Sequence, residues 1–176
     1  MWHYNIEDYD YRFHDDYTLQ LYDNKRFVAE LSFRLDGKAL WITNLYRTEY
    51  GKTAENPDRH YGTEIFAILL IHLFRKGESF DSIIGRLSVQ DADWNNWMTS
   101  IPYYAKFQQY VPDEVGYRLN FALFEDKAAM QQNQSVPLPA YKEKETFRAF
   151  VAEFQQEHIR ACKDAYFCYA VERIHP

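Results

Sequence analysis

Cysteine and long apolar runs are both scarce in this sequence. Only two of the 176 residues are cysteine, Cys162 and Cys168, and both lie near the end of the chain. This is unlike the dense cysteine spacing of secreted disulfide-stabilised domains, so we expect reduced thiols. The longest nearly apolar run, residues 65–74, is interrupted by His72. It has about half of the roughly 20 residues that a membrane-spanning helix needs, so we expect no membrane span.

A secretory signal and an excess of positive charge are missing too. Residues 1–5 contain neither a basic stretch nor an apolar segment, so we expect a cytoplasmic protein. Twenty Lys and Arg stand against 26 Asp and Glu, a net charge of -6. Since negative proteins are not attracted to a phosphate backbone, we predict no nucleic-acid partner. The aromatic residues fall mostly at strand-face and helix-face positions, which indicates core packing rather than base stacking.

Sequence motifs for several kinds of chemistry are lacking. The chain has no phosphate-binding Walker sequence and no Gly-x-Ser-x-Gly turn. His158 and Cys162 are four residues apart and have Cys168 and His175 nearby, but their helix face also carries aromatic residues. Core packing explains that face better than metal binding, and we predict no metal site.

An alternation of apolar and polar residues with period two runs from Tyr17 to Tyr46 and predicts antiparallel strands. Asp23-Asn24 and Asp36-Gly37 interrupt it with residues that suit tight turns. The expected strands cover residues 17–22, 26–35 and 39–46, with an earlier one near 9–13.

The period then changes to that of a helix. Apolar residues at 65, 68, 69 and 73 mark one face, and Gly77 can supply the left-handed stop. Residues 80–89 follow as a strand, parallel to 39–46 through a right-handed crossover. We therefore predict an α/β fold with a mixed, mostly antiparallel sheet and a central parallel strand-helix-strand crossover. A second helix is expected over 92–110 and a strand over 117–124.

The last part of the chain predicts a helical appendage. Residues 131–139 are polar and contain two prolines, which is typical of a linker. Aromatic residues at helical spacing predict a helix over 142–162, docked on the core or on the second subunit of a homodimer. A final strand is expected over 165–171. The domain limits are 1–125 for the core, 126–140 for the linker and 141–176 for the appendage, which together form one structural domain.

Residues 59–64, Arg-His-Tyr-Gly-Thr-Glu, lie between a predicted strand and a buried helix. The N–H groups at a helix N-terminus suit phosphate, Gly62 permits close approach, and Arg59 can add charge-assisted contacts. Two alternatives need no ligand. Asn56 can cap a helix that starts at Pro57, and Thr63 can serve as the cap.

The order of these elements resembles the GNAT N-acetyltransferase superfamily, as a divergent member. Arg59 and Gly62 match its Arg/Gln-x-x-Gly-x-Gly/Ala motif for the CoA pyrophosphate. Residues 84–89 stand where the family's next strand runs beside the pantetheine arm, and Tyr104-Ala105-Lys106-Phe107 resembles its Tyr-x-Lys-Leu segment. The resemblance covers residues 17–124.

This resemblance implies direct acyl transfer from acetyl-CoA, the cosubstrate, to an amine of a small molecule or peptide. It implies an acyl-CoA N-acyltransferase-like core in which the following residues contact the cofactor: Leu45, Tyr46, Arg59, Tyr61, Gly62 and Thr63.

The catalytic assignments stay open between neighbours. Tyr104 is the implied proton donor to the thiolate, and Tyr103 competes with it because a shift of one residue in the helix start exchanges them. Glu49, Glu30 and Asp91 are candidate bases, and a water chain would serve as well.

Several positions depart from the family pattern. Glu64 replaces a small residue of the loop motif and brings a negative charge near the phosphates. The Gly-Phe after the tyrosine segment is replaced by Gln108-Gln109-Tyr110, and the two helices after the family's first strand are absent. The alternative is therefore a non-catalytic GNAT-like interaction protein that has lost CoA binding.

Overall fold

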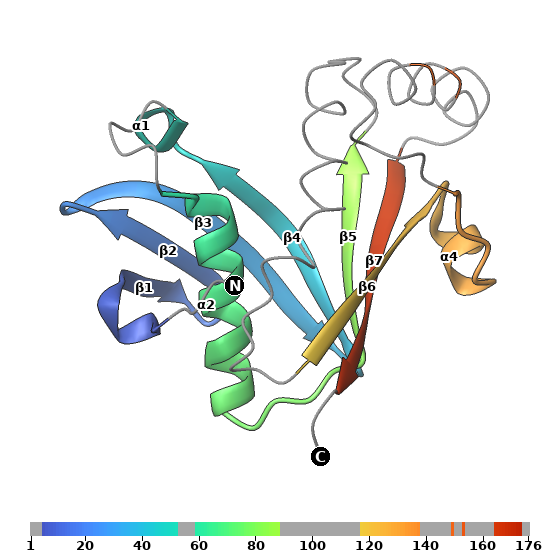
Figure 1. Cartoon of the computed structure of the whole chain (residues 1–176), viewed down its shortest axis with the longest axis horizontal. Helices are drawn as coiled ribbons and strands as arrows, with labels where there is room; N and C mark the ends of the chain where they lie inside the picture. Colours follow the sequence, from blue (N-terminus) through green and yellow to red (C-terminus); the bar gives the residue numbers. More distant parts are fainter. Residues whose placement is uncertain are drawn as a thin grey trace.

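One seven-stranded sheet organises the described part of the chain. The computed structural model describes residues 5–52, 59–88, 117–137 and 164–173, with the single positions 149 and 153. The order across the sheet is β1-β2-β3-β4-β5-β7-β6 (Figure 1). The strands are β1 (Asp10–Asp15), β2 (Thr18–Asp23), β3 (Arg26–Asp36), β4 (Ala39–Arg47), β5 (Ser82–Ser88), β6 (Tyr117–Phe124) and β7 (Asp164–Arg173). The helices are a 3-10 turn (Ile6–Asp8), α1 (Glu49–Lys52), α2 (Tyr61–Arg75) and α4 (Lys127–Gln131).

Strands β4 and β5 form the predicted parallel pair. Ala39 to Ile42 lie opposite Ser82 to Gly85, and α2 makes the crossover between the strands. The remaining neighbours in this sheet pair antiparallel. The predicted fold class, a mixed and mostly antiparallel sheet with a central parallel crossover, is confirmed.

Tight turns join the first four strands. Asn24 and Lys25, between β2 and β3, have φ of 48° and 65°, and Gly37 between β3 and β4 has φ of 59°. Asp15, which ends β1, accepts a hydrogen bond from the backbone N–H of Tyr17 at 2.8 Å, and β2 begins at the next residue. The chain returns directly from β1 to β2, so no helix lies between these two described strands.

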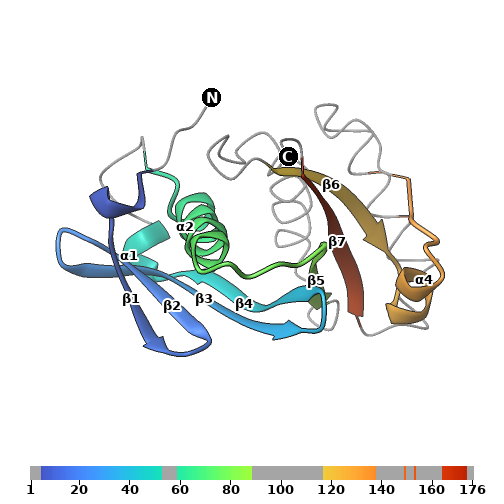
Figure 2. The same cartoon turned by 90° about the horizontal axis from the view of Figure 1, so that it is seen from below.

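Helix α2 packs on β2, β3 and β4 and supplies one side of the core. Its residues 65–71 are exposed by 2% or less, and they share the core with Leu19, Leu31 and Leu40 of the sheet. Complete burial of one such aliphatic side chain stabilises the fold by about 1.5–3 kcal/mol. Packing therefore holds this helix in place. Figure 2 shows α2 on one face of the β1–β4 half of the sheet.

The ends of α2 test two expectations. The two residues before Tyr61 are not helical, so the helix does not start at Pro57; Asn56 itself lies outside the described residues. At the other end, Gly77 has φ of 80°, as its predicted role in stopping the helix requires.

The two C-terminal strands are also found where they were predicted, with β7 longer at both ends than the predicted 165–171. β6 has the predicted bounds, and β7 lies between β5 and β6 in the sheet. Val136, within the predicted linker, donates its N–H to the carbonyl of Leu123 at 2.7 Å. The expected helix over 92–110 lies outside the described residues, and of that over 142–162 only positions 149 and 153 are described, both helical.

Gly85 marks the last paired position of β5 with β4, and it lies beneath an aromatic ring of β7. It is opposite Phe167, and a Cβ added to Gly85 would stand 1.9 Å from Phe167 Cζ. Phe167 is 1% exposed, so its ring has little room to move. The absence of a side chain at this position therefore lets β5 and β7 pack together.

We expect Gly85→Ala to lower the free energy of unfolding by about 1–3 kcal/mol, because the ring must leave its packed position. Urea denaturation measures the change. Ser82→Ala on the same strand is the matched control and should stay within about 0.5 kcal/mol of the wild type. Equal losses in the two variants would contradict the proposed clash.

Candidate functional site

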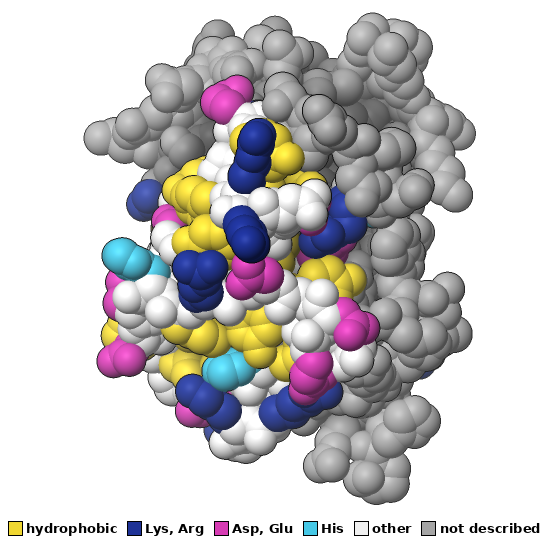
Figure 3. Space-filling model, turned by 90° about the vertical axis from the view of Figure 1, so that its left-hand side faces the viewer, with side chains coloured by type: hydrophobic (Ala, Val, Ile, Leu, Met, Phe, Trp, Pro, Cys, Tyr) yellow, Lys and Arg dark blue, Asp and Glu magenta, His cyan; other side chains and the backbone are white. Residues whose placement is uncertain are grey.

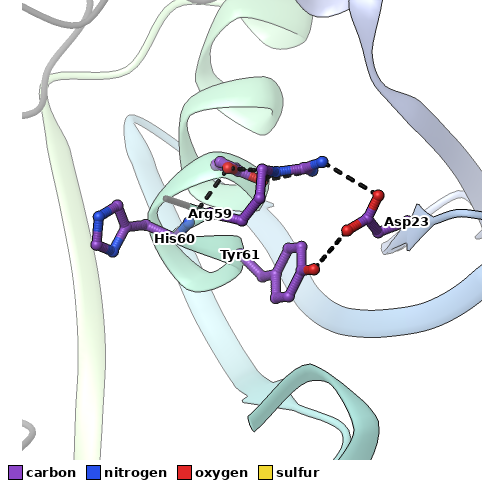
Figure 4. A network of polar contacts seen from close by, with 5 residues as sticks. Asp23, Arg59, His60 and Tyr61 are labelled. Carbon is purple, nitrogen blue, oxygen red and sulfur yellow. Dashed lines mark hydrogen bonds and ion pairs between the residues drawn. The ribbon is translucent and has the colours of Figure 1, made fainter. Parts of the chain in front are cut away.

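Glu64, in the first turn of α2, is buried and held by Arg59. Its side chain is 3% exposed, and Arg59 Nε and Nη2 donate to its two carboxylate oxygens at 2.8 Å each. Glu64 Oε1 also accepts the backbone N–H of His60 at 3.2 Å. This bidentate contact compensates the free-energy cost of removing water from the carboxylate. Figure 4 shows the network from close by.

Arg59 is enclosed on its other sides. Its Nη1 lies 3.3 Å from Asp23 Oδ1 at the end of β2. The guanidinium carbon lies 5.4 Å from the ring centre of Tyr9 and 5.0 Å from that of Tyr61. Hydrogen bonding to Glu64 raises the pKa of Arg59. Two carboxylates and two aromatic rings therefore surround one permanently charged side chain.

Tyr61 completes the network from the first helical position. Its hydroxyl donates to Asp23 Oδ2 at 2.5 Å. Burial and this hydrogen bond raise the pKa of Tyr61 to about 12, so the phenol remains a donor at neutral pH. The loop before α2 is thus tied to the turn between β2 and β3.

Glu64 points to the β2 side of α2. Phe66, two residues later, contacts Tyr169 of β7 with ring centres 6.4 Å apart, and residues two apart point about 200° apart around a helix. Glu64 lies instead on the side where Arg59 reaches Asp23. The carboxylate of Glu64 is therefore paired with Arg59 and directed away from the side of the sheet formed by β5, β7 and β6.

The N-terminus of α2 carries backbone donors that the helix itself cannot satisfy. The first four N–H groups of a helix have no intrahelical acceptor, and here Glu64 takes only that of His60. His60 makes no capping bond with its side chain. Among the described residues no acceptor outside the helix is recorded for the N–H groups of Tyr61, Gly62 and Thr63, which lie at the positive end of the helix dipole. An anion is suited to this position.

Strand β4 changes its pairing halfway along its length. It pairs with β5 as far as Ile42. In the register with β3, Phe33 lies opposite Ile42 and Ser32 lies opposite Asn44, so Thr43 is an extra residue. This is a β-bulge, which bends and twists a strand. The rest of β4 pairs with β3 alone among the described residues, and β4 and β5 diverge (Figure 1).

Leu45 and Tyr46, two of the predicted cofactor contacts, lie on this open part of β4. Leu45 is opposite Leu31 and partly buried, whereas Tyr46 is opposite Glu30 and 40% exposed. Burial and the nearby negative charge of Glu30 raise the pKa of Tyr46. The start of α2 lies at the same end of the sheet as the end of β4 (Figure 1).

The candidate catalytic residues are placed less completely. Glu49 begins α1 directly after β4, with its carboxylate 2.9 Å from Lys52 Nζ and its side chain 88% exposed. Thr48 Oγ1 accepts the N–H of Gly51 at 3.0 Å and so fixes this short helix. Tyr104, its alternative Tyr103 and the candidate base Asp91 lie outside the described residues.

Sequence reasoning missed two members of the network, Asp23 and Tyr9. Asp23 was assigned only to a turn, yet it binds both Arg59 and Tyr61. It precedes Tyr61 by 38 residues, and no local pattern links the two positions. Only the pairing of β2 in the sheet brings them together.

Metal and membrane sites find no support in the described residues. None of these residues form a group of three or more His, Cys, Asp or Glu that could hold a metal ion. No helix in this part of the chain is long and apolar enough to cross a membrane. Basic and acidic side chains are interspersed on the face shown in Figure 3.

We expect Arg59→Met to lower the free energy of unfolding by about 2–3 kcal/mol, because Glu64 stays buried without its cation. This is below the upper range for buried pairs, since Arg59 keeps 24% exposure of its side chain. In the double variant Arg59→Met/Glu64→Met the loss should be smaller than in the single variant. Urea denaturation of the single and the double variant measures these changes in the free energy of unfolding. An equal or larger loss in the double variant would contradict the pairing of Arg59 with Glu64.

Comparisons with known proteins give a likeness of fold. No family model and no curated protein matches the chain. It is similar to a Bacillus subtilis acetyltransferase in complex with CoA, at 10% identity over 87% of this chain and 74% of that chain, with a TM-score of 0.40. It is also similar to the ribosomal-protein-S18-alanine N-acetyltransferase of Escherichia coli, at 10% identity over 90% of this chain and 70% of that chain, with a TM-score of 0.41.

A third similar structure is the aminoglycoside 6'-N-acetyltransferase of Enterococcus faecium, at 10% identity over 90% of this chain and 73% of that chain, with a TM-score of 0.38. All three are acetyltransferases, the class that the sequence motifs resemble.

Proposed function

We propose that this protein is an acyl-CoA-dependent N-acyltransferase, which transfers an acetyl group from acetyl-CoA directly to an amine of a small molecule or peptide. The observation that carries the proposal is the parting of β4 from β5 at the bulge of Thr43. Beyond the bulge β4 has one strand neighbour among the described residues, and the positive end of α2 lies at the same end of the sheet (Figure 1).

The shape and chemistry of CoA fit these two features together. Its pantetheine arm is an extended chain with amide groups, and such a chain can pair with the open edge of a strand. The arm would lie beside Leu45 and Tyr46. The pyrophosphate would meet the N–H groups at the start of α2, where Gly62 lets it approach the backbone.

In this proposal Arg59 acts by positioning the loop instead of contacting phosphate. Its guanidinium is already bound to Glu64 and Asp23, and it holds Glu64 on the β2 side of α2. Removal of that negative charge from the phosphate position is what permits an anion to bind at Gly62. The Glu64 substitution in the loop motif is thereby compatible with CoA.

The transfer step moves two protons. The amine nitrogen attacks the thioester carbonyl, a C–N bond forms, and the C–S bond breaks. The amine loses a proton and the departing thiolate gains one. Tyr104 is our candidate for the donor to the thiolate. Two described carboxylates are candidates to accept the amine proton. Glu30 lies opposite Tyr46 near the end of β4, and Glu49 follows β4 in the chain.

A non-catalytic interaction protein with the same fold is the second candidate. The observation that favours it is that Arg59 Nε and Nη2 bind Glu64 and Nη1 lies against Asp23, so the guanidinium already has partners within the protein. The aromatic helix expected over 142–162 would then serve as a surface for a partner or for a homodimer.

We expect acetyl-CoA to raise the melting temperature of the wild type. A ligand at 100 times its dissociation constant adds about 2.7 kcal/mol of stability. Gly62→Asp should abolish this shift, because its carboxylate would stand where the pyrophosphate binds. The fold should persist, since an acidic residue suits the first turn of a helix. Thermal-shift titration measures both.

Asn133→Asp is the matched control, since it adds the same charge after α4, away from α2. It should keep the wild-type shift. No shift of the wild type at millimolar acetyl-CoA would reject the enzyme and favour the interaction protein. A shift that survives in Gly62→Asp would place the cofactor elsewhere.

A further inference from the structure

A row of polar side chains crosses the sheet on the face that α2 does not cover. Gln20 of β2 lies opposite Glu30 of β3, which lies opposite Tyr46 of β4. Leu19 and Leu31, their neighbours in sequence, are fully buried in the core with α2. Because side chains alternate along a strand, the row faces the other way. Figure 2 shows no described helix over that face of β1–β4.

Glu30 stands in this row without a cationic partner in the described part of the chain. Gln20 Nε2 donates to Glu30 Oε2 at 2.8 Å, and the hydroxyl of Tyr22 donates to Gln20 Oε1 at 3.0 Å, which fixes the amide. The donor recorded for Glu30 among the described residues, this amide, is neutral. Within the described ranges no Lys or Arg pairs with Glu30, whereas an arginine neutralises Glu64. A partly buried carboxylate held in this way favours a cation from outside.

The surroundings of Glu30 suit an ammonium group. The Tyr46 ring meets Phe27 edge-on with ring centres 6.4 Å apart, and Phe27 lies 5.8 Å from Tyr22. Aromatic rings beside a carboxylate add cation–π attraction. Cross-strand neighbours have Cβ atoms about 4.5–5.5 Å apart, so Glu30 lies one strand in from the open edge of β4. A side chain or small amine at that edge can reach it.

We propose that Glu30 binds the ammonium group of the acceptor and takes up one of its protons, with Gln20 holding the carboxylate in place. Tyr46 lines this subsite between Glu30 and the edge where the acyl donor lies. The inference rests on the proposed function and adds a substrate class to it: primary alkylamines, which are cationic at neutral pH. It also selects Glu30 over the exposed Glu49.

The proton balance of this step is complete. The Glu30 carboxylate accepts one proton from the ammonium group, and the neutral nitrogen attacks the thioester carbonyl. The C–S bond breaks and its electron pair leaves on the thiolate. The remaining excess proton on nitrogen passes to the thiolate, directly or through a donor such as Tyr104. The Glu30 carboxyl group then releases its proton to solvent.

Glu30→Gln in the full chain tests the assignment, because the amide keeps the shape and can still accept the Gln20 N–H. With n-hexylamine and acetyl-CoA, followed by thiol release, kcat/KM should fall about 100-fold. With O-butylhydroxylamine, which is neutral at pH 7, it should fall less than about tenfold. Glu172→Gln removes a matched carboxylate from β7 and should leave both values unchanged. The acetyl-CoA thermal shift should persist in Glu30→Gln.

Calorimetric binding of n-hexylamine without acetyl-CoA separates this inference from the proposed function. We expect Glu30→Gln to weaken that binding about tenfold or more. Binding that depends on Glu30 in a protein without an acetyl-CoA shift would reject the acyltransferase and retain the cation subsite. If Glu30→Gln binds and acetylates n-hexylamine like the wild type, or if the wild type does not bind it, the assignment of Glu30 is overturned.

Discussion

The loss of water around one carboxylate, that of Glu64, sets the geometry at this end of the molecule. A side chain with 3% exposure holds a negative charge only with strong partners, and Arg59 supplies them. Arg59 in turn binds Asp23, which ends β2. Because Arg59 precedes α2 in the chain, this contact ties the first turn of the helix to the antiparallel strands β1–β4. The N-terminus of α2 is thereby held in a fixed position relative to the open edge of β4.

Glu64 and Glu30 show how two carboxylates of one fold take different roles. Glu64 is paired with Arg59 within the protein, so it contributes to structure and its carboxylate is occupied by this partner. Glu30 is held by the neutral amide of Gln20 on the opposite face of the sheet, and in our proposal its charge is available to a ligand. Between these two positions runs the part of β4 beyond the Thr43 bulge. An acyl donor along that edge would have its phosphates near the first site and its acceptor near the second.

Local patterns predicted the fold well, and the site only in part. The strands β2, β3 and β4 and the stop at Gly77 were predicted to within one residue, because alternation and turn residues act over a few positions. The bulge at Thr43 has no such signal, since it arises from the register between strands. The role of Arg59 was ambiguous for a physical reason: an arginine beside a helix N-terminus suits a phosphate or a carboxylate equally. Its second partner, Asp23, is also distant in sequence.

The central claim is that an acyl-CoA lies along β4 beyond its bulge, with its phosphates at the start of α2. Amide hydrogen exchange of the wild type with and without saturating acetyl-CoA tests it most directly. The account predicts slower exchange in two separate segments, Asn44 to Arg47 and Tyr61 to Thr63, because ligand groups accept or shield their N–H groups. Unchanged exchange in both segments, or protection confined to other strands, would contradict it.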